Sequence, residues 1–231
     1  MGAHAGNFVS ALILAFVSLF PVVNPIGDAP IFLSLTRQYP QSVRRMLAYK
    51  VAAYGFALLA GSLVFGSEIL AFFGVTLAMV QIAGGLVLCS TGWQLLNKKE
   101  DTAGDKQEAP ATAQDALLQA FYPLTLPITV GPGCISIAIG LGAHMRYQAG
   151  PGFEHGYPLR FLGALTGMAF VCLLVVVCYG NAERLVRRLG RSGTDIVIRL
   201  SAFILLAIGV QITWNGVGSA VQQLLAHTGA R

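Results

Sequence analysis

An interrupted apolar segment near the start of the chain constrains its fold more than any other feature. Residues 8–35 are apolar enough to cross a bilayer, yet the middle of this run holds three prolines, a glycine and two polar residues. Proline removes a backbone N–H and clashes with the preceding helical turn, so a helix cannot continue smoothly through Asn24-Pro25. In hydrocarbon, the freed backbone groups must find partners inside the protein or in a water-filled cavity. We therefore expect two half-helices that meet inside the membrane.

A second interruption of the same kind lies in the other half of the chain, in the sequence Phe121-Tyr-Pro-Leu-Thr-Leu-Pro-Ile-Thr-Val-Gly-Pro-Gly133. A pair of Pro- or Gly-interrupted apolar segments at corresponding positions in two halves is typical of secondary transporters. In those proteins the substrate site lies near the middle of the bilayer, where the broken helices meet. The two interruptions therefore predict both a membrane fold and the position of a binding site.

The composition indicates a helical membrane protein with many spans. Of the 231 residues, 55% are hydrophobic and only 11% are charged, whereas soluble domains average about 25% charged residues. The net charge of +5 is not gathered in an aromatic-interleaved basic patch, so we expect no nucleic-acid partner. The four cysteines lie in apolar segments without metal-ligand spacing and are interpreted as packing residues. We expect no metal and no cofactor.

The hydropathy pattern divides the chain into two halves of three membrane segments each. The expected segments cover residues 8–36, 46–65, 69–96, 116–142, 159–179 and 195–217. A short turn with Ser67 and Glu68 is expected between the second and third, and residues 97–115 are predicted to be a flexible cytoplasmic linker between residues 1–96 and 116–231. Because each half has an odd number of segments, the second half is inverted. The sequence thus predicts an all-α membrane protein of two inverted three-helix repeats, each with a broken first helix.

The distribution of cations predicts the orientation in the membrane. Most of the 15 lysines and arginines lie in the loops that follow the first, third and fifth segments. These cations are Arg37, Arg44, Arg45, Lys50, Lys98, Lys99, Lys106, Arg184, Arg187, Arg188 and Arg191. Cytoplasmic loops of membrane proteins carry an excess of such residues. We therefore expect these loops in the cytoplasm and both termini on the outer, periplasmic side.

The two breaks have the chemistry to bind a zwitterion. A helix end carries about half an elementary charge, positive at its N-terminus and negative at its C-terminus. Two inverted breaks can therefore offer N–H groups to a carboxylate and carbonyl groups to an ammonium. The predicted substrate-binding residues are Asn24, Pro25, Gly27, Asp28, Thr125, Thr129, Gly131, Pro132 and Gly133. The alternative interpretation is that these prolines and glycines only kink helices for packing.

Four further polar residues within the segments are candidates for coupling or for the transport pathway. Asp28 has two open roles, as the N-cap of the second half-helix or as a proton carrier, because an intramembrane carboxylate is costly. Arg199 has three open roles: it could pair with Asp28, line the pathway, or extend its side chain to the membrane interface. Gln81 and Gln211 are expected to be inter-helix hydrogen-bond partners, with a pathway role as the alternative.

Several motifs together resemble the MarC family of bacterial inner-membrane proteins. They are Asn24-Pro-Ile-Gly-Asp-Ala-Pro-Ile-Phe32, the stretch from Pro123 to Gly133, Ile82-Ala-Gly-Gly85, and Arg199-Leu with Gly209-Val-Gln211. The resemblance covers nearly the whole chain. It implies a multi-pass protein of the inner membrane with six membrane helices. It also implies transport of neutral amino acids, as in a group similar to the LysE-type exporters. The chain departs from the pattern at Gln81, where members often carry arginine, and at Asp28, where asparagine is frequent.

The expected function is secondary transport or export of small polar metabolites, above all neutral amino acids, by alternating access. No P-loop is present, so the expected driving force is an H⁺ or Na⁺ gradient or the gradient of the substrate. The alternatives are an exporter of another metabolite or drug, and a non-transporting membrane scaffold or assembly protein. No enzymatic activity is expected, because the four histidines lie at termini or in loops and no catalytic motif is present. The sequence leaves the oligomeric state open.

Overall fold

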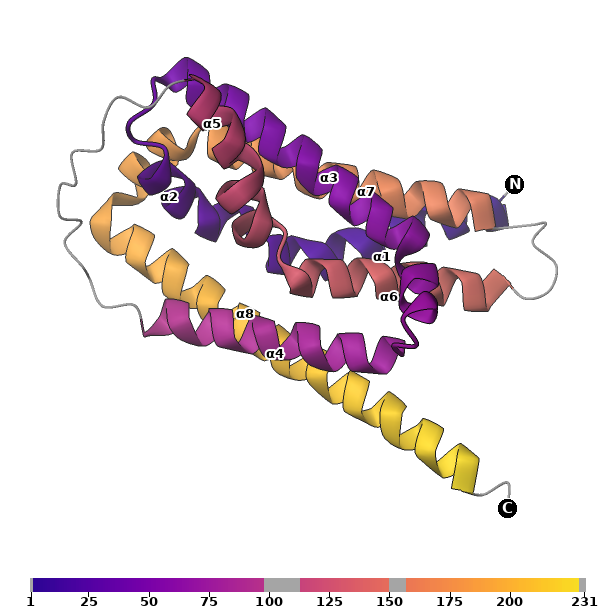
Figure 1. Ribbon diagram of the computed structural model, residues 1–231. Coiled ribbons are helices and arrows are strands. Elements are labelled where there is room, and N and C mark those ends of the chain that lie inside the picture. Colours follow the sequence, from indigo (N-terminus) through magenta and orange to yellow (C-terminus); the bar gives the residue numbers. More distant parts are fainter. Residues whose placement is uncertain (1, 98–112, 150–156, 229–231) are drawn as a thin grey trace.

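The computed structural model describes residues 2–97, 113–149 and 157–228, and this part of the chain is a bundle of long helices (Figure 1). The helices are α1 (Gly2–Val23), α2 (Pro25–Leu35), α3 (Gln41–Phe72), α4 (Leu77–Leu96), α5 (Ala113–Gln119), the π-helical η1 (Ala120–Thr129), α6 (Pro132–Ala149), α7 (Tyr157–Gly180) and α8 (Ala182–Thr228). The first helix begins, and the last helix ends, at the same end of the bundle (Figure 1).

The described residues contain enough long apolar helices for the six segments that the sequence predicts. Four helices are long and apolar enough to cross a bilayer, and these lie in α3, α4, α7 and α8. Two bent pairs bring the number of spans to as many as six, if each pair forms one span. The first pair joins Asn7–Val23 to Pro25–Leu35, and the second joins Ala116–Thr129 to Pro132–Arg146. The all-helical membrane fold is therefore confirmed.

One predicted turn is wrong. Ser67 and Glu68 lie inside α3, which continues to Phe72, and the connection to α4 consists of the next four residues. Neither serine nor glutamate stops a helix that is held by its neighbours, since a serine hydroxyl and a carboxylate can face outward. The helix ends where Gly74 takes a φ of 66°, a left-handed conformation that glycine adopts without steric cost.

The basic residues expected in loops lie largely on helices. α3 already begins at Gln41, directly after Pro40, so its first turns carry Arg44, Arg45 and Lys50. α8 begins at Ala182 and continues past the predicted end at residue 217, so Arg184, Arg187 and Arg188 also lie on a helix. Its one non-helical position is Gly190, with φ 66° and ψ −178°, which divides the short basic part from the long apolar part.

Small residues bring two pairs of helices into close contact. Where α4 crosses α8, a Cβ atom added to Gly209 would lie 2.7 Å from the backbone nitrogen of Cys89 and 2.8 Å from the carbonyl oxygen of Gly85. Where α1 crosses α7, a Cβ atom on Gly167 would lie against the carbonyl oxygen of Leu12. Close backbone approach at small residues is how membrane helices gain packing energy. These glycines are therefore points of close helix packing.

Candidate functional site

The first break is a sharp bend at a single residue. α1 ends at Val23 and α2 begins at Pro25, and the two are bent by 40°. Asn24 between them takes a left-handed conformation with φ 47° and ψ 53°, which asparagine tolerates better than most residues. Its Oδ1 atom accepts a hydrogen bond from the Gly27 backbone N–H at 3.3 Å. Pro25 fills the first helical position, where no N–H is required.

The cap of α2 is Asn24, and the N-cap role predicted for Asp28 is wrong. Asp28 lies in the first turn of α2, and its backbone N–H donates to the carbonyl oxygen of Asn24 at 3.0 Å. The Asp28 side chain is only 7% exposed, and its Oδ1 atom accepts from the Asn24 carboxamide at 3.4 Å. The positive end of the helix dipole favours a carboxylate in this turn. Asp28 is thus a buried acid next to the break, and it does not cap α2.

The second break bends the chain more sharply than the first. η1 and α6 meet at a bend of 71°, and Tyr122 and Leu126 have non-helical backbone angles directly before Pro123 and Pro127. A residue before proline is driven away from the helical region, so both interruptions follow from the sequence. The hydroxyl groups of the buried Thr125 and Thr129 donate to carbonyl oxygens five residues earlier, at 2.6 and 2.7 Å. These threonines therefore add side-chain hydrogen bonds to the backbone of the irregular helix.

One tyrosine that the sequence analysis did not single out connects the two breaks. The Tyr179 hydroxyl, at the end of α7, lies 2.9 Å from the Thr129 hydroxyl. Its ring stacks on Phe32 of α2, with 4.5 Å between the ring centroids. Tyr179 is 2% exposed. The interrupted parts of both halves are therefore held around one buried side chain, whose position at the end of an apolar run gave no motif to detect.

The glycines at the breaks make room for neighbouring helices. A Cβ atom on Gly27 would lie 2.7 Å from the hydroxyl oxygen of Ser201 on α8, and one on Gly133 would meet the Leu88 side chain of α4 at 2.5 and 2.6 Å. Gly133 is buried beneath that leucine. The Gly133 backbone therefore packs against a neighbouring helix and is not open to a solute. Gly131 is half-buried and has the Pro127 carbonyl oxygen as the nearest neighbour of an added Cβ atom.

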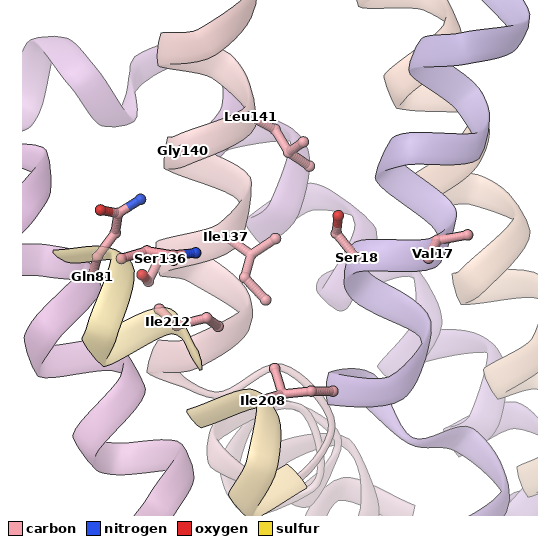
Figure 2. A pocket seen from close by; sticks show the side chains of 10 residues that line it. Val17, Ser18, Gln81, Ser136, Ile137, Gly140, Leu141, Ile208 and Ile212 are labelled. Atoms are coloured by element: carbon pink, nitrogen blue, oxygen red, sulfur yellow. The ribbon is translucent and has the colours of Figure 1, made fainter. Parts of the chain in front are cut away.

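A cavity of about 340 Å³ lies beside the second break, and residues of α1, α4, α6 and α8 line it (Figure 2). On α6 it begins one turn after Pro132. Its lining consists of Val17, Ser18, Gln81, Ser136, Ile137, Gly140, Leu141, Ile208, Ile212 and Asn215. Figure 2 shows the Ser18 hydroxyl and the Leu141 side chain pointing into the same space from α1 and α6. The volume falls in the range of small-molecule sites, about 300–1,000 Å³.

The cavity brings together only some of the predicted residues. Gln81 lines it directly. Gln211 donates from its Nε2 atom to the Oδ1 atom of the lining residue Asn215 at 2.9 Å; both residues lie on α8, so the inter-helix bond expected for Gln211 is wrong. The nine residues predicted at the breaks are outside the lining. Arg199 lies exposed on α8, and within the described part of the chain it forms no ion pair with Asp28. Ser18, Ser136 and Asn215 complete the polar lining, although neither serine stood in a predicted motif.

The middle helix of the first half carries an ion pair near each of its ends. At its start, Arg44 pairs with Glu183 of α8 at 2.7 Å. Near its other end, Glu68 pairs with Arg146 of α6, and this arginine also donates to the carbonyl oxygen of Val64. Ion pairs therefore link α3 to α8 near one end and to α6 near the other.

Comparison with known proteins places the chain in a family. The description "MarC family integral membrane protein" matches residues 9–221. The chain belongs to the MarC family. A UPF0056 membrane protein of Methanocaldococcus jannaschii is 33% identical, with 90% of this chain and 97% of that protein aligned. YvbG of Bacillus subtilis, also named a UPF0056 membrane protein, is 30% identical over 90% of this chain and 94% of its own length.

A further relative is named as a protein of the inner membrane. The inner membrane protein MarC of Salmonella typhimurium is 28% identical, with 91% of this chain and 96% of that protein aligned. No solved structure is similar. The family and the apolar helices agree that the chain is an integral membrane protein.

Proposed function

We propose that this MarC-family chain is a secondary transporter or exporter of small polar metabolites, with neutral amino acids as the first candidates. The observation that carries the proposal is the cavity beside the second break, whose lining mixes uncharged polar groups with aliphatic side chains. Transporters place their solute beside interrupted helices, where irregular backbone borders a cavity. A membrane scaffold needs neither a cavity of this size nor two interrupted spans.

The pattern of helix contacts supports an inverted repeat. In this proposal the broken segment formed by α1 and α2 corresponds to the broken segment formed by α5, η1 and α6. The helix α3 then corresponds to α7, and α4 corresponds to α8. The broken segment of each half packs on the middle helix of the other: α1 and α2 against α7, η1 and α6 against α3. The contact of α2 with α8 matches that of α6 with α4, and α4 packs on α8. Exchanging the halves therefore preserves these main contacts, as expected for a pseudo-two-fold axis.

Alternating access follows from this arrangement as a relative movement of two units. The α4–α8 pair is held tightly by its glycine contacts, and it forms one wall of the cavity. Its movement against α1 and α6 would open the cavity to one side of the membrane and then to the other. In this scheme the ion pair between Arg44 of α3 and Glu183 of α8 breaks and re-forms. Energy comes from an H⁺ or Na⁺ gradient, or from the solute's own gradient.

The test is counterflow in proteoliposomes that contain the purified full-length chain. Vesicles preloaded with an unlabelled neutral amino acid should transiently accumulate the labelled form, and vesicles without protein should not. A panel of neutral, acidic and basic amino acids, followed by other polar metabolites and drugs, identifies the solute class. Counterflow of a drug alone would favour the drug-exporter alternative. Absence of counterflow for the entire panel, with correctly inserted protein, would reject transport in favour of a scaffold role.

A further inference from the structure

Ser136 is the polar side chain in the cavity that most clearly calls for a ligand. It is 1% exposed, and within the described residues its Oγ atom has no hydrogen-bond partner. Buried hydroxyl groups in proteins nearly always have a partner, and each exception calls for an explanation. The neighbouring helix makes room for this hydroxyl, because a Cβ atom on Gly84 of α4 would lie 2.9 Å from the Ser136 Oγ atom.

Two carboxamides from other helices line the same cavity. Gln81 of α4 is half-buried, and in the described part of the chain its amide makes no hydrogen bond. Asn215 of α8 uses its Oδ1 atom to accept from Gln211, which leaves its Nδ2 donor available. Three helices therefore supply uncommitted donors to one space, and none of the residues that line the cavity carries a charge.

Apart from Ser18 of α1 and Gly140 of α6, the rest of the lining is aliphatic. Ile137 and Leu141 of α6, Ile208 and Ile212 of α8, and Val17 of α1 contribute to it. An isolated charge would lose its hydration in such a site without gaining a counter-charge, so charged solutes are disfavoured. An uncharged or zwitterionic solute with an aliphatic part avoids that cost and matches both kinds of lining.

We propose that Gln81, Ser136 and Asn215 form a binding subsite for a hydrogen-bonding group of a small solute that has no net charge. The aliphatic part of the solute packs on the neighbouring isoleucines and leucine. The subsite deepens the proposed transport function and rests on it for its biological purpose, but its occupancy can be measured at equilibrium without transport.

The first test measures equilibrium binding of labelled leucine, alanine, lysine and glutamate to the purified full-length protein. We expect saturable binding of the neutral amino acids. Ser136→Ala should raise their Kd on the order of tenfold, because the bound solute loses one hydrogen-bond partner. Ser62→Ala is the matched control: that part-buried serine of α3 donates to the Leu58 carbonyl oxygen of its own helix at 2.7 Å. Its Kd should not change.

A second variant separates recognition from simple loss of structure. Gln81→Glu keeps the shape of the side chain but adds a negative charge to the cavity. It should weaken binding of alanine and leucine and improve binding of lysine relative to them, whereas a merely misfolded protein would lose all binding. Melting temperatures of both variants, measured without solute, show whether each is folded.

The outcomes distinguish the subsite from the transport function. Unchanged affinities in folded Ser136→Ala and Gln81→Glu would overturn the subsite, even if the wild-type protein transports. Binding of neutral solutes that depends on Ser136, without counterflow, would reject transport and retain the subsite. Failure of both neutral solutes to bind the folded wild-type protein would overturn the proposed ligand class.

Discussion

At the scale of single residues, the structure distinguishes Asn24 from Asp28, whereas the sequence could not tell which of the two caps α2. Both residues are polar and flank the same break, and either can cap a helix. The left-handed backbone of Asn24 and its bond to the Gly27 N–H make asparagine the cap. Asp28 is buried and its carboxylate meets the Asn24 amide. The structure leaves the acid available for another role, and proton coupling is the role that we expect.

Replacing Asp28 by asparagine tests that role. Asp28→Asn retains an oxygen that can accept from the Asn24 amide, but it cannot release or take up a proton. If Asp28 carries the coupling proton, gradient-driven accumulation in proteoliposomes should be lost while solute exchange survives and loses its pH dependence. Asp195→Asn, a half-buried acid in the last helix, is the control and should behave as wild type. Unchanged accumulation across the pH range would exclude Asp28 from coupling.

At the scale of helices, the breaks were predictable and the cavity was not. The effect of proline on its own and the preceding residue is local, so the interruptions at Pro25, Pro123 and Pro127 could be predicted from the sequence, although Pro21 and Pro30 lie inside α1 and α2. The site depends on tertiary placement: Ser136 and Asn215 are ordinary polar residues until α6 and α8 bring them to one space. The wrong turn near Ser67 has the same origin, because packing of α3 against α6 extends the helix beyond its apolar run.

The crossing of α4 and α8 gives a prediction about stability. In Gly209→Ala the new methyl group would lie 2.7 Å from the backbone nitrogen of Cys89, and backbone cannot move aside as a flexible side chain can. We expect a loss of about 1–3 kcal/mol, the usual cost of overpacking. Gly218→Ala on the same helix is the control, since no atom lies within 4 Å of its added Cβ. Thermal unfolding in detergent measures both. Equal melting temperatures would contradict the tight crossing.

At the scale of the whole molecule, the positions of the cations and of the chain ends are consistent with one orientation. α1 begins and α8 ends at one end of the bundle, while the arginine-bearing starts of α3 and α8 lie at the other (Figure 1). The number of spans could be predicted because bilayer thickness sets the length of an apolar helix. The predicted linker lies mainly at residues 98–112, outside the described residues.

Thiol labelling tests the orientation. A cysteine at Val75, in the connection between α3 and α4, should react with a membrane-impermeant reagent in intact cells. A cysteine at the exposed Gln38, between α2 and α3, should react only after the membrane is opened. The unsubstituted chain is the control, because its four native cysteines are buried or half-buried. Labelling of residue 38 in intact cells, with residue 75 protected, would reverse the orientation.

The uncharged lining of the cavity has an electrical consequence. A membrane potential acts on a moving charge with about 2.3 kcal/mol per elementary charge per 100 mV. A solute without net charge, carried in a cavity whose lining residues are all uncharged, moves no charge across the field. Exchange of such a solute should therefore run at the same rate at any voltage. Any current during net transport would then count the coupling ions directly, one elementary charge for each ion that crosses with the solute.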